Sequence, residues 1–312
     1  MTTTSTLTRL LPLLVLLAAP LAAQERHRER DRERDRDEDR DYQTRIDTTV
    51  ALSANATADL SLISGEIIVT AASGNQARVR AYSEHGDVEF QSSPSRLSLS
   101  VRSRRGRTGD TRYEVAVPVG TRLLLRTTSG DIRARGVRGE VEAHTTSGDV
   151  EVQGGATRIT LESVSGDIHG EQLDGSVRVS ATSGDVTLER VTGDVEVETV
   201  SGEISITDAR SKWVRTETTS GDVDYRGTID TTGRYDFTSH SGEVTLVVPA
   251  DAGGQLSVET FSGSIESDFP MTIQPNGADS GGRPKRMQFT FGAGSARISI
   301  ETFSGDVRIE KR

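Results

Sequence analysis

Apolar and polar residues alternate along residues 123–312 in a pattern that repeats. A Ser-Gly pair returns roughly every 18–21 residues, and only its last interval is twice as long. Seven and five residues before each glycine, and two after it, the residue is mostly Val, Ile or Leu, whereas the positions between are mostly polar. Period-two alternation is typical of strands that bury one face. The repeat glycines are Gly130, Gly148, Gly166, Gly184, Gly202, Gly221, Gly242, Gly263 and Gly305.

A second set of glycines divides the repeat in half. Gly139, Gly175 and Gly193 each lie nine residues after a repeat glycine, so one unit holds two turns and two strands. One such unit cannot fold alone, because the few side chains it buries do not offset the ordering of its backbone. The sequence therefore predicts an all-β, single-stranded β-solenoid built from coils of about 18–21 residues.

The N-terminal region differs in composition from the repeats. Residues 1–23 predict a cleaved signal peptide, with Arg9 before the apolar run 10–17 and small residues before Gln24. A retained anchor is the alternative. Residues 24–41 alternate in charge and predict a hydrated linker without a core. No later stretch is apolar and long enough to span a membrane.

The solenoid itself is predicted over residues 42–312. Residues 123–312 carry the regular coils, and residues 42–122 are expected to form less regular ones, since Ser64-Gly65-Glu66-Ile67 is a full copy of the turn. Residues 267–286 interrupt the rhythm with Pro270, Pro275 and Pro284, which predicts a surface loop or part of a cap.

The residue after each repeat glycine is nearly always acidic. We interpret this acid as part of a tight corner, in which glycine allows a positive φ and the carboxylate bonds nearby backbone. A stack of such acids could also attract Ca²⁺, although no Gly-Gly pair continues into a calcium-repeat motif. Three residues before the glycine stands a Thr or Ser, whose hydroxyls are expected to bond along the stack. The acidic series is Asp131, Asp149, Asp167, Asp185, Glu203, Asp222, Glu243 and Asp306, with Ser264 as its exception.

Candidate chemistry is sparse. The chain has no cysteine, and His144, His169 and His240 fall at different offsets from their glycines, while His27 lies in the linker, so no zinc site is predicted. No serine has a nucleophile motif. The sequence thus predicts no catalytic, cofactor-binding or metal-binding residues, and no enzyme. A net charge of −10 disfavours nucleic acid as a partner. The basic cluster at Arg102, Arg104, Arg105 and Arg107 is interpreted as a solvated loop.

Exposed aromatic residues are the usual platform for carbohydrates, and three are candidates here. These are Trp213, Phe261 and Phe303, the last two at the same offset, two residues before a repeat glycine. Their parity points outward, yet we expect Phe261 and Phe303 to pack under residues 267–286.

Several separated motifs resemble the bacterial putative-adhesin family of β-strand repeats, a domain of unknown function. They are the Thr-Thr-Ser-Gly-Asp-Ile turns, the lead-in Val117-Pro118-Val119-Gly120-Thr121 and the ending Phe303-Ser304-Gly305-Asp306-Val307. The resemblance covers residues 45–312. It implies a right-handed β-helix-like domain on exported or envelope proteins, some linked to surface adhesion, and it brings no catalytic residues.

The function predicted is that of an exported, non-enzymatic, adhesin-like binding or scaffolding protein of the bacterial cell envelope. Its location would be the periplasm, the cell surface or the extracellular space, and its partner an envelope polymer, a glycan or a surface protein. Two alternatives stay open: a polysaccharide-active β-helix enzyme, and a solenoid stabilised by Ca²⁺. The ligand, the mode of attachment and the oligomeric state are left open.

Overall fold

The computed structural model describes residues 44–103, 109–270, 272–274, 285–292 and 295–312. The chain divides into two compact units, Met1–Tyr42 and Gln43–Arg312. The predicted signal peptide (1–23) and linker (24–41) lie outside the described residues, as do Arg104, Arg105 and Arg107, and those interpretations stay predictions. Within the described ranges, no helix is long and apolar enough to cross a membrane.

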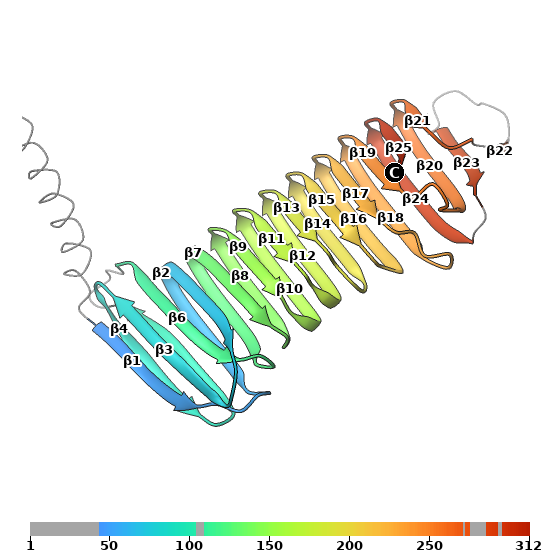
Figure 1. Ribbon diagram of the computed structural model, residues 1–312. Coiled ribbons are helices and arrows are strands. Elements are labelled where there is room, and N and C mark those ends of the chain that lie inside the picture. The colour runs from blue at the N-terminus through green and yellow to red at the C-terminus, as the bar shows by residue number, and fades with distance from the viewer. Residues whose placement is uncertain (1–43, 104–108, 271, 275–284, 293–294) are drawn as a thin grey trace, which may run out of the picture. The chain divides into compact units, whose positions relative to one another are not determined.

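The repeats form a stack of parallel strands, as the alternation predicts (Figure 1). Val141 pairs with Ile159, its equivalent in the next coil, and the same register continues through Val177 and Val195. The described residues of the second unit are all-β, which confirms the all-β class, whereas the exact coil size and the right-handed winding stay predictions. The central strands are β7 (Arg122–Val137), β8 (Val141–Ser147), β9 (Val150–Gly154), β10 (Ala156–Ser165), β11 (Ile168–Glu171), β12 (Asp174–Ser183), β13 (Val186–Glu189), β14 (Val195–Ser201), β15 (Ile204–Ala209), β16 (Trp213–Ser220), β17 (Val223–Gly227), β18 (Arg234–Ser241) and β19 (Val244–Val248).

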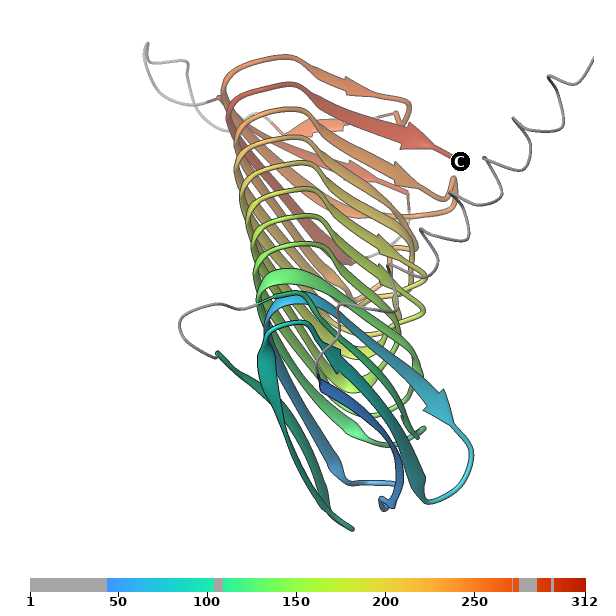
Figure 2. The same ribbon diagram turned by 90° about the vertical axis from the view of Figure 1, so that its left-hand side faces the viewer.

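Each coil has two arms that meet at a rounded bend (Figure 2). The first arm contributes residues such as Val177 and Val179 to the core, and the second contributes Val186 and Leu188, all at most 1% exposed. Because neighbouring strands lie about 4.8 Å apart, each apolar side chain packs on its equivalents in the coils on either side. The core is therefore continuous along the stack.

Glycine at the bend is required by the closeness of adjacent coils. Gly166 has φ +135°, a conformation that L side chains rarely adopt, and a Cβ on it would lie 2.1 Å from the carbonyl oxygen of Gly148. The repeat glycines therefore mark the positions at which successive backbones come closest.

The coils widen toward the C-terminal end, where aromatic side chains replace aliphatic ones in the core. Tyr225 packs edge-on against Tyr235 and Phe237, with ring centroids 6.0 and 5.5 Å away. The Tyr235 hydroxyl donates to the carbonyl oxygen of Ser211 at 2.7 Å. Burial raises the pKa of both tyrosines, so their hydroxyls remain hydrogen-bond donors. Larger side chains thus fill the space that the longer C-terminal coils enclose.

The N-terminal end differs from the irregular coils expected over residues 42–122. β2 stacks in parallel on β7 over both of its arms, and β5 and β6 stack in parallel on one arm of β2 each. The remaining pairs, β1–β3, β3–β6 and β4–β5, are antiparallel. The physical reason for β4–β5 is the two-residue turn Pro94-Ser95, because only antiparallel strands can be joined so briefly. These strands are β1 (Thr44–Ala51), β2 (Thr57–Ala72), β3 (Gln76–Ser83), β4 (Gly86–Ser93), β5 (Arg96–Ser103) and β6 (Thr111–Pro118).

At the C-terminal end the strands do not stack in sequence order. β24 lies between β18 and β20 and is parallel to both, and β25 lies between β19 and β21. The last coil in the sequence is therefore inserted before the coil of Gly263, which ends the stack. Within residues 267–286, β22 and the start of β23 are described, and β23 pairs antiparallel with β20, so they form part of a cap. These strands are β20 (Gly254–Ser262), β21 (Ile265–Ser267), β22 (Thr272–Gln274), β23 (Lys285–Phe291), β24 (Ala296–Ser304) and β25 (Val307–Lys311).

Replacing Val186 with Asp should unfold several neighbouring coils together. Val186 is fully buried, so an unpaired carboxylate there should lower the free energy of unfolding by about 4 kcal/mol or more. Hydrogen exchange read by mass spectrometry should show lost protection in β11, β13 and β15. The control, Thr187→Asp on the outward side of the same strand, should cost less than about 1 kcal/mol. Loss of protection confined to β13 would contradict a shared core.

The inserted order can be tested by disulfide trapping, since the chain contains no native cysteine. Thr238 is paired with Glu301 across β18 and β24, whereas Glu259 lies one strand further away. A Thr238→Cys/Glu301→Cys variant should therefore oxidise to a disulfide, and a Thr238→Cys/Glu259→Cys variant, about 9.6 Å apart, should not. The reverse result, read by mass spectrometry under mild oxidation, would show that the coils stack in sequence order.

Candidate functional site

The acids at the corners of the coils bond the stack together. Asp149 accepts a hydrogen bond on Oδ1 from the backbone N–H of Asp167 at 3.0 Å, and Asp167 accepts one from Asp185 at 2.9 Å. The same bond joins the coils of Asp222 and Glu243, at 2.7 Å. One carboxylate oxygen at these corners is thus used by the fold, which supports the structural interpretation of the acid.

The one residue of the series that is not acidic, Ser264, lies in the coil that ends the stack. Asp306 accepts both the backbone N–H and the hydroxyl of Ser264, each at 2.8 Å. These two bonds hold the pKa of Asp306 below its ordinary value of 3.8. Ser264 carries no carboxylate to accept from a further coil, and its coil is the one that ends the stack. At Glu203, by contrast, burial raises the pKa, and neighbouring carboxylates, Asp224 first, add to this.

Among the described residues, the Thr and Ser hydroxyls of successive coils do not form the predicted hydrogen bonds with one another. Thr145 and Ser239 instead donate to backbone carbonyl oxygens, of Gly130 and Gly221, both at 3.3 Å. Six others in the column have no protein partner among the described residues. The column is buried beside the glycine bend, and its two bonded members reach the backbone of the preceding coil rather than a neighbouring hydroxyl. These six are Thr127, Ser163, Thr199, Thr218, Thr260 and Thr302.

The histidines take up separate places. His144 lies between two acids, with Nδ1 at 2.8 Å from Glu162 and Nε2 at 3.1 Å from Glu142. His240 instead stacks on Phe303. Among residues that the structure describes, no group of three or more His, Asp or Glu side chains could hold a metal ion.

Two of the predicted aromatic candidates come together on the outside of the corner. The rings of Phe261 and Phe303 stack with centroids 5.0 Å apart and an angle of 1°, and His240 continues the stack at 4.9 Å. Both phenylalanines are about half exposed, at 50% and 51%, which differs from the expectation that they pack beneath residues 267–286. We call His240, Phe303 and Phe261 the aromatic ladder.

The aromatic ladder is the end of a longer column. Residues two before each corner glycine point outward, and five of the six large apolar side chains that are exposed in the described ranges belong to this outer column. Two separate cavities lie beside it, one of about 380 Å³ near Val164 and one of about 430 Å³ at the ladder. Glu217, Glu259 and Glu301 line the second cavity. The five apolar members of the column are Ile63, Val164, Val200, Phe303 and Phe261.

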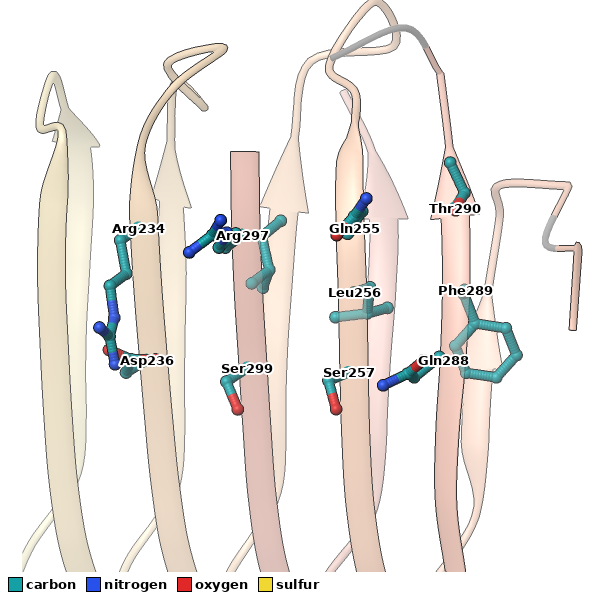
Figure 3. Close-up of a pocket in the computed structure, with 11 residues that line it drawn as sticks. Arg234, Asp236, Gln255, Leu256, Ser257, Gln288, Phe289, Thr290, Arg297 and Ser299 are labelled. Atoms are coloured by element: carbon teal, nitrogen blue, oxygen red, sulfur yellow. The ribbon is translucent and has the colours of Figure 1, made fainter. Parts of the chain in front are cut away.

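A polar cavity lies on the outward face of the same C-terminal coils (Figure 3). Its volume is about 400 Å³, and residues of β18, β24, β20 and β23 line it. Arg234 donates from Nε to Asp236 Oδ2 at 2.7 Å. Figure 3 shows Arg297 on β24 between Arg234 and Gln255, with Ser299 and Ser257 on the next row. We call this the arginine cavity.

The third aromatic candidate, Trp213, lies outside the lining of that cavity, on the strand next to Arg234. It is half-buried at the start of β16, where its register partner is Arg234. No sequence pattern marks the arginine cavity as a unit, although Arg234 and Arg297 share one offset, eight residues before their glycines. Their adjacency depends on the insertion of β24, which the spacing alone does not reveal.

Residues 59–207 and 158–310 both match the model of a protein family described as Toastrack DUF4097. The chain belongs to this Toastrack family. The overlapping matches span most of the chain, and the membership confirms the resemblance seen in the sequence. No curated protein matches this Toastrack protein.

Three solved structures are similar to this Toastrack protein. A "putative lipid binding protein" from Parabacteroides distasonis is 13% identical, with a TM-score of 0.45, over 85% of this chain and 97% of that one. A "putative adhesin" from Bacteroides fragilis is 14% identical, with a TM-score of 0.39, over 86% and 98%. A "putative cell adhesion protein" from Clostridium sporogenes is 9% identical, with a TM-score of 0.28, over 86% and 100%. At such identities, those descriptions assign no role to any residue here.

Acid should weaken the attachment of the coil of Gly263, which Asp306 holds through Ser264. Because the folded-state pKa lies below 3.8, the bonded carboxylate stabilises the fold above that pH, and this contribution is lost as the pH falls through the folded pKa. In Asp306→Asn the side chain does not titrate. Urea unfolding between pH 6 and pH 2 should therefore show a smaller acid-induced loss in the variant than in the parent. Equal losses would show that Asp306 takes no part.

Proposed function

We propose that this Toastrack protein is an exported, non-enzymatic protein that binds or scaffolds at the bacterial cell envelope, in the manner of an adhesin. The observation that carries the proposal is the half-exposed aromatic ladder at the end of the outer column. Single exposed apolar side chains are common on protein surfaces, whereas contiguous ones mark interaction surfaces. A stack of rings beside a cavity offers a partner a rigid contact.

The rest of the outward surface supports this assignment by contrast. Arginines there are commonly paired with acids, as in Arg126 with Asp59 at 3.4 Å and Arg135 with Glu151 at 2.8 Å. Such pairs occupy the charged groups and leave a hydrated surface. The aromatic ladder and the arginine cavity both depart from this pattern, and both lie on β18, β24 and β20. We therefore place the ligand surface on these three strands.

A second candidate function has one observation in its favour. Three carboxylates, of Glu217, Glu259 and Glu301, line the cavity at the aromatic ladder, and polysaccharide-active enzymes work through clustered carboxylates. No arginine among the described residues lines that cavity. Binding a ligand also requires less precise placement of side chains than catalysis does. Release of reducing ends or unsaturated sugars from acidic glycans by the purified protein would favour this second function over the first.

Binding can be tested with the immobilised protein and solubilised envelope fractions, both polysaccharide and protein. A Phe261→Ser/Phe303→Ser variant should retain at least about tenfold less of its ligand, the loss expected when central aromatic contacts are removed. The control is Val164→Thr, which changes an exposed residue of the same column to the residue type found at Thr146 and Thr182. Equal retention by all three proteins, or none by the parent, would contradict the proposal.

A further inference from the structure

One outward row of the stack brings two arginines together. Eight residues before their corner glycines, Trp213, Arg234, Arg297 and Gln255 lie side by side on β16, β18, β24 and β20. Elsewhere in this row an arginine has an acid beside it, as Arg122 has Glu140 at 3.3 Å. Directly opposed like charges destabilise neighbouring strands. The packing of the strands alone therefore does not account for Arg234 and Arg297 at adjacent positions.

The charge of this pair is only partly offset within the protein. Asp236 engages Nε of Arg234, and the two terminal nitrogens of that guanidinium have no partner among the described residues. Arg297 makes no ion pair or side-chain hydrogen bond within the part of the chain that the structure describes. Only one of the two guanidinium groups thus has a carboxylate partner, and an external anion would restore the balance.

The groups around the two arginines indicate what else the ligand carries. Gln255 and Gln288 supply amides, and Ser257 and Ser299 supply hydroxyls, all lining the same cavity. Amides and hydroxyls both donate and accept, so they suit the hydroxyl groups of a sugar. Trp213 lies outside the lining but next to Arg234, and it is an aromatic surface of the kind on which sugar rings stack. A cavity of about 400 Å³ lies within the range of small-ligand sites.

We infer that the arginine cavity binds a sugar residue that bears a carboxylate, a uronic acid within a glycan. Its carboxylate lies between Arg234 and Arg297, because planar guanidinium groups bind carboxylates through paired hydrogen bonds. The amides and serines hold the ring hydroxyls. This inference rests on the proposed function, since it names the ligand class of the same surface.

The net charge of the protein further limits the class of anionic ligand that the cavity can bind. Anionic membranes attract clusters of four to eight basic residues, whereas this chain carries a net charge of −10 and places Glu301 and Glu259 on the same strands as the cavity. The same field repels a densely charged polymer. A glycan in which neutral sugars separate the uronic acids supplies a carboxylate to the two arginines and keeps the charge density of the polymer low.

Trp213 provides a direct measurement, because it is the only tryptophan in the chain. The probe is a hyaluronan hexasaccharide, in which glucuronate alternates with N-acetylglucosamine, and its neutral counterpart is chitohexaose. The hyaluronan hexasaccharide should change the fluorescence of Trp213 in a saturable way, and chitohexaose should bind at least about tenfold more weakly. Titration with inorganic sulfate and with phosphatidylglycerol vesicles should give no comparable saturation.

Arginine variants separate the site from the general charge of the protein. Arg297→Gln should weaken binding of the hexasaccharide at least about tenfold, and Arg297→Lys should fall between, since lysine keeps the charge but loses the paired hydrogen bonds. The control is Arg158→Gln, an exposed arginine of the same row four strands of the first arm away from Arg234. It should bind as the parent does. Far-UV circular dichroism and melting temperature verify that each variant is folded.

Several results would overturn the inference: equal binding of chitohexaose, equal binding by Arg297→Gln, an equal loss in Arg158→Gln, or tighter binding of vesicles or sulfate. If any of these occurs while the envelope fractions still bind through the aromatic ladder, the proposed function stands and only the uronate site is wrong. If the envelope fractions also fail to bind, both are wrong.

Discussion

The structure depends on the close approach of successive coils at their corners. Glycine removes the Cβ that would strike the carbonyl of the coil before, and the following aspartate accepts the next coil's N–H. The two contacts fix both the spacing and the register of the coils. Every outward column then inherits that register, so a side chain repeated in sequence becomes a row in space. The surface chemistry of this protein is accordingly arranged in rows.

The departures from these rows carry the functional argument. Along the central coils, outward arginines commonly meet acids, and the outer column alternates threonine with valine. On β18, β24 and β20 the pattern changes at two places along the strands. Rings stack in the outer column, two residues before the corner glycines, and two arginines lie side by side eight residues before those glycines. A protein selected only to stack would have no reason to place either feature there. Their common location argues for one extended ligand that spans both.

The sequence predicts the coils well because their determinants are local and periodic. The columns around Gly166 identify the core, and the acid after each glycine identifies the corner. Three features escaped prediction. The antiparallel N-terminal strands follow from short turns such as Pro94-Ser95, whose effect depends on which strands are neighbours. The arginine cavity exists only because β24 is inserted. That insertion had a sign in the sequence, the single Ser264 in an otherwise acidic series, which became readable once the corner bonds were known.

The inserted coil also links the surface to the order in which the chain is made. A ribosome releases residues 254–267 before residues 296–311, yet in the finished molecule the later segment lies inside the earlier one. The stack can grow from its N-terminal end as far as β19, and then it must wait for β24, which pairs with β18. Phe303 and Arg297 both arrive on that strand. A chain that stops before β24 would therefore present neither the complete ladder nor the arginine pair.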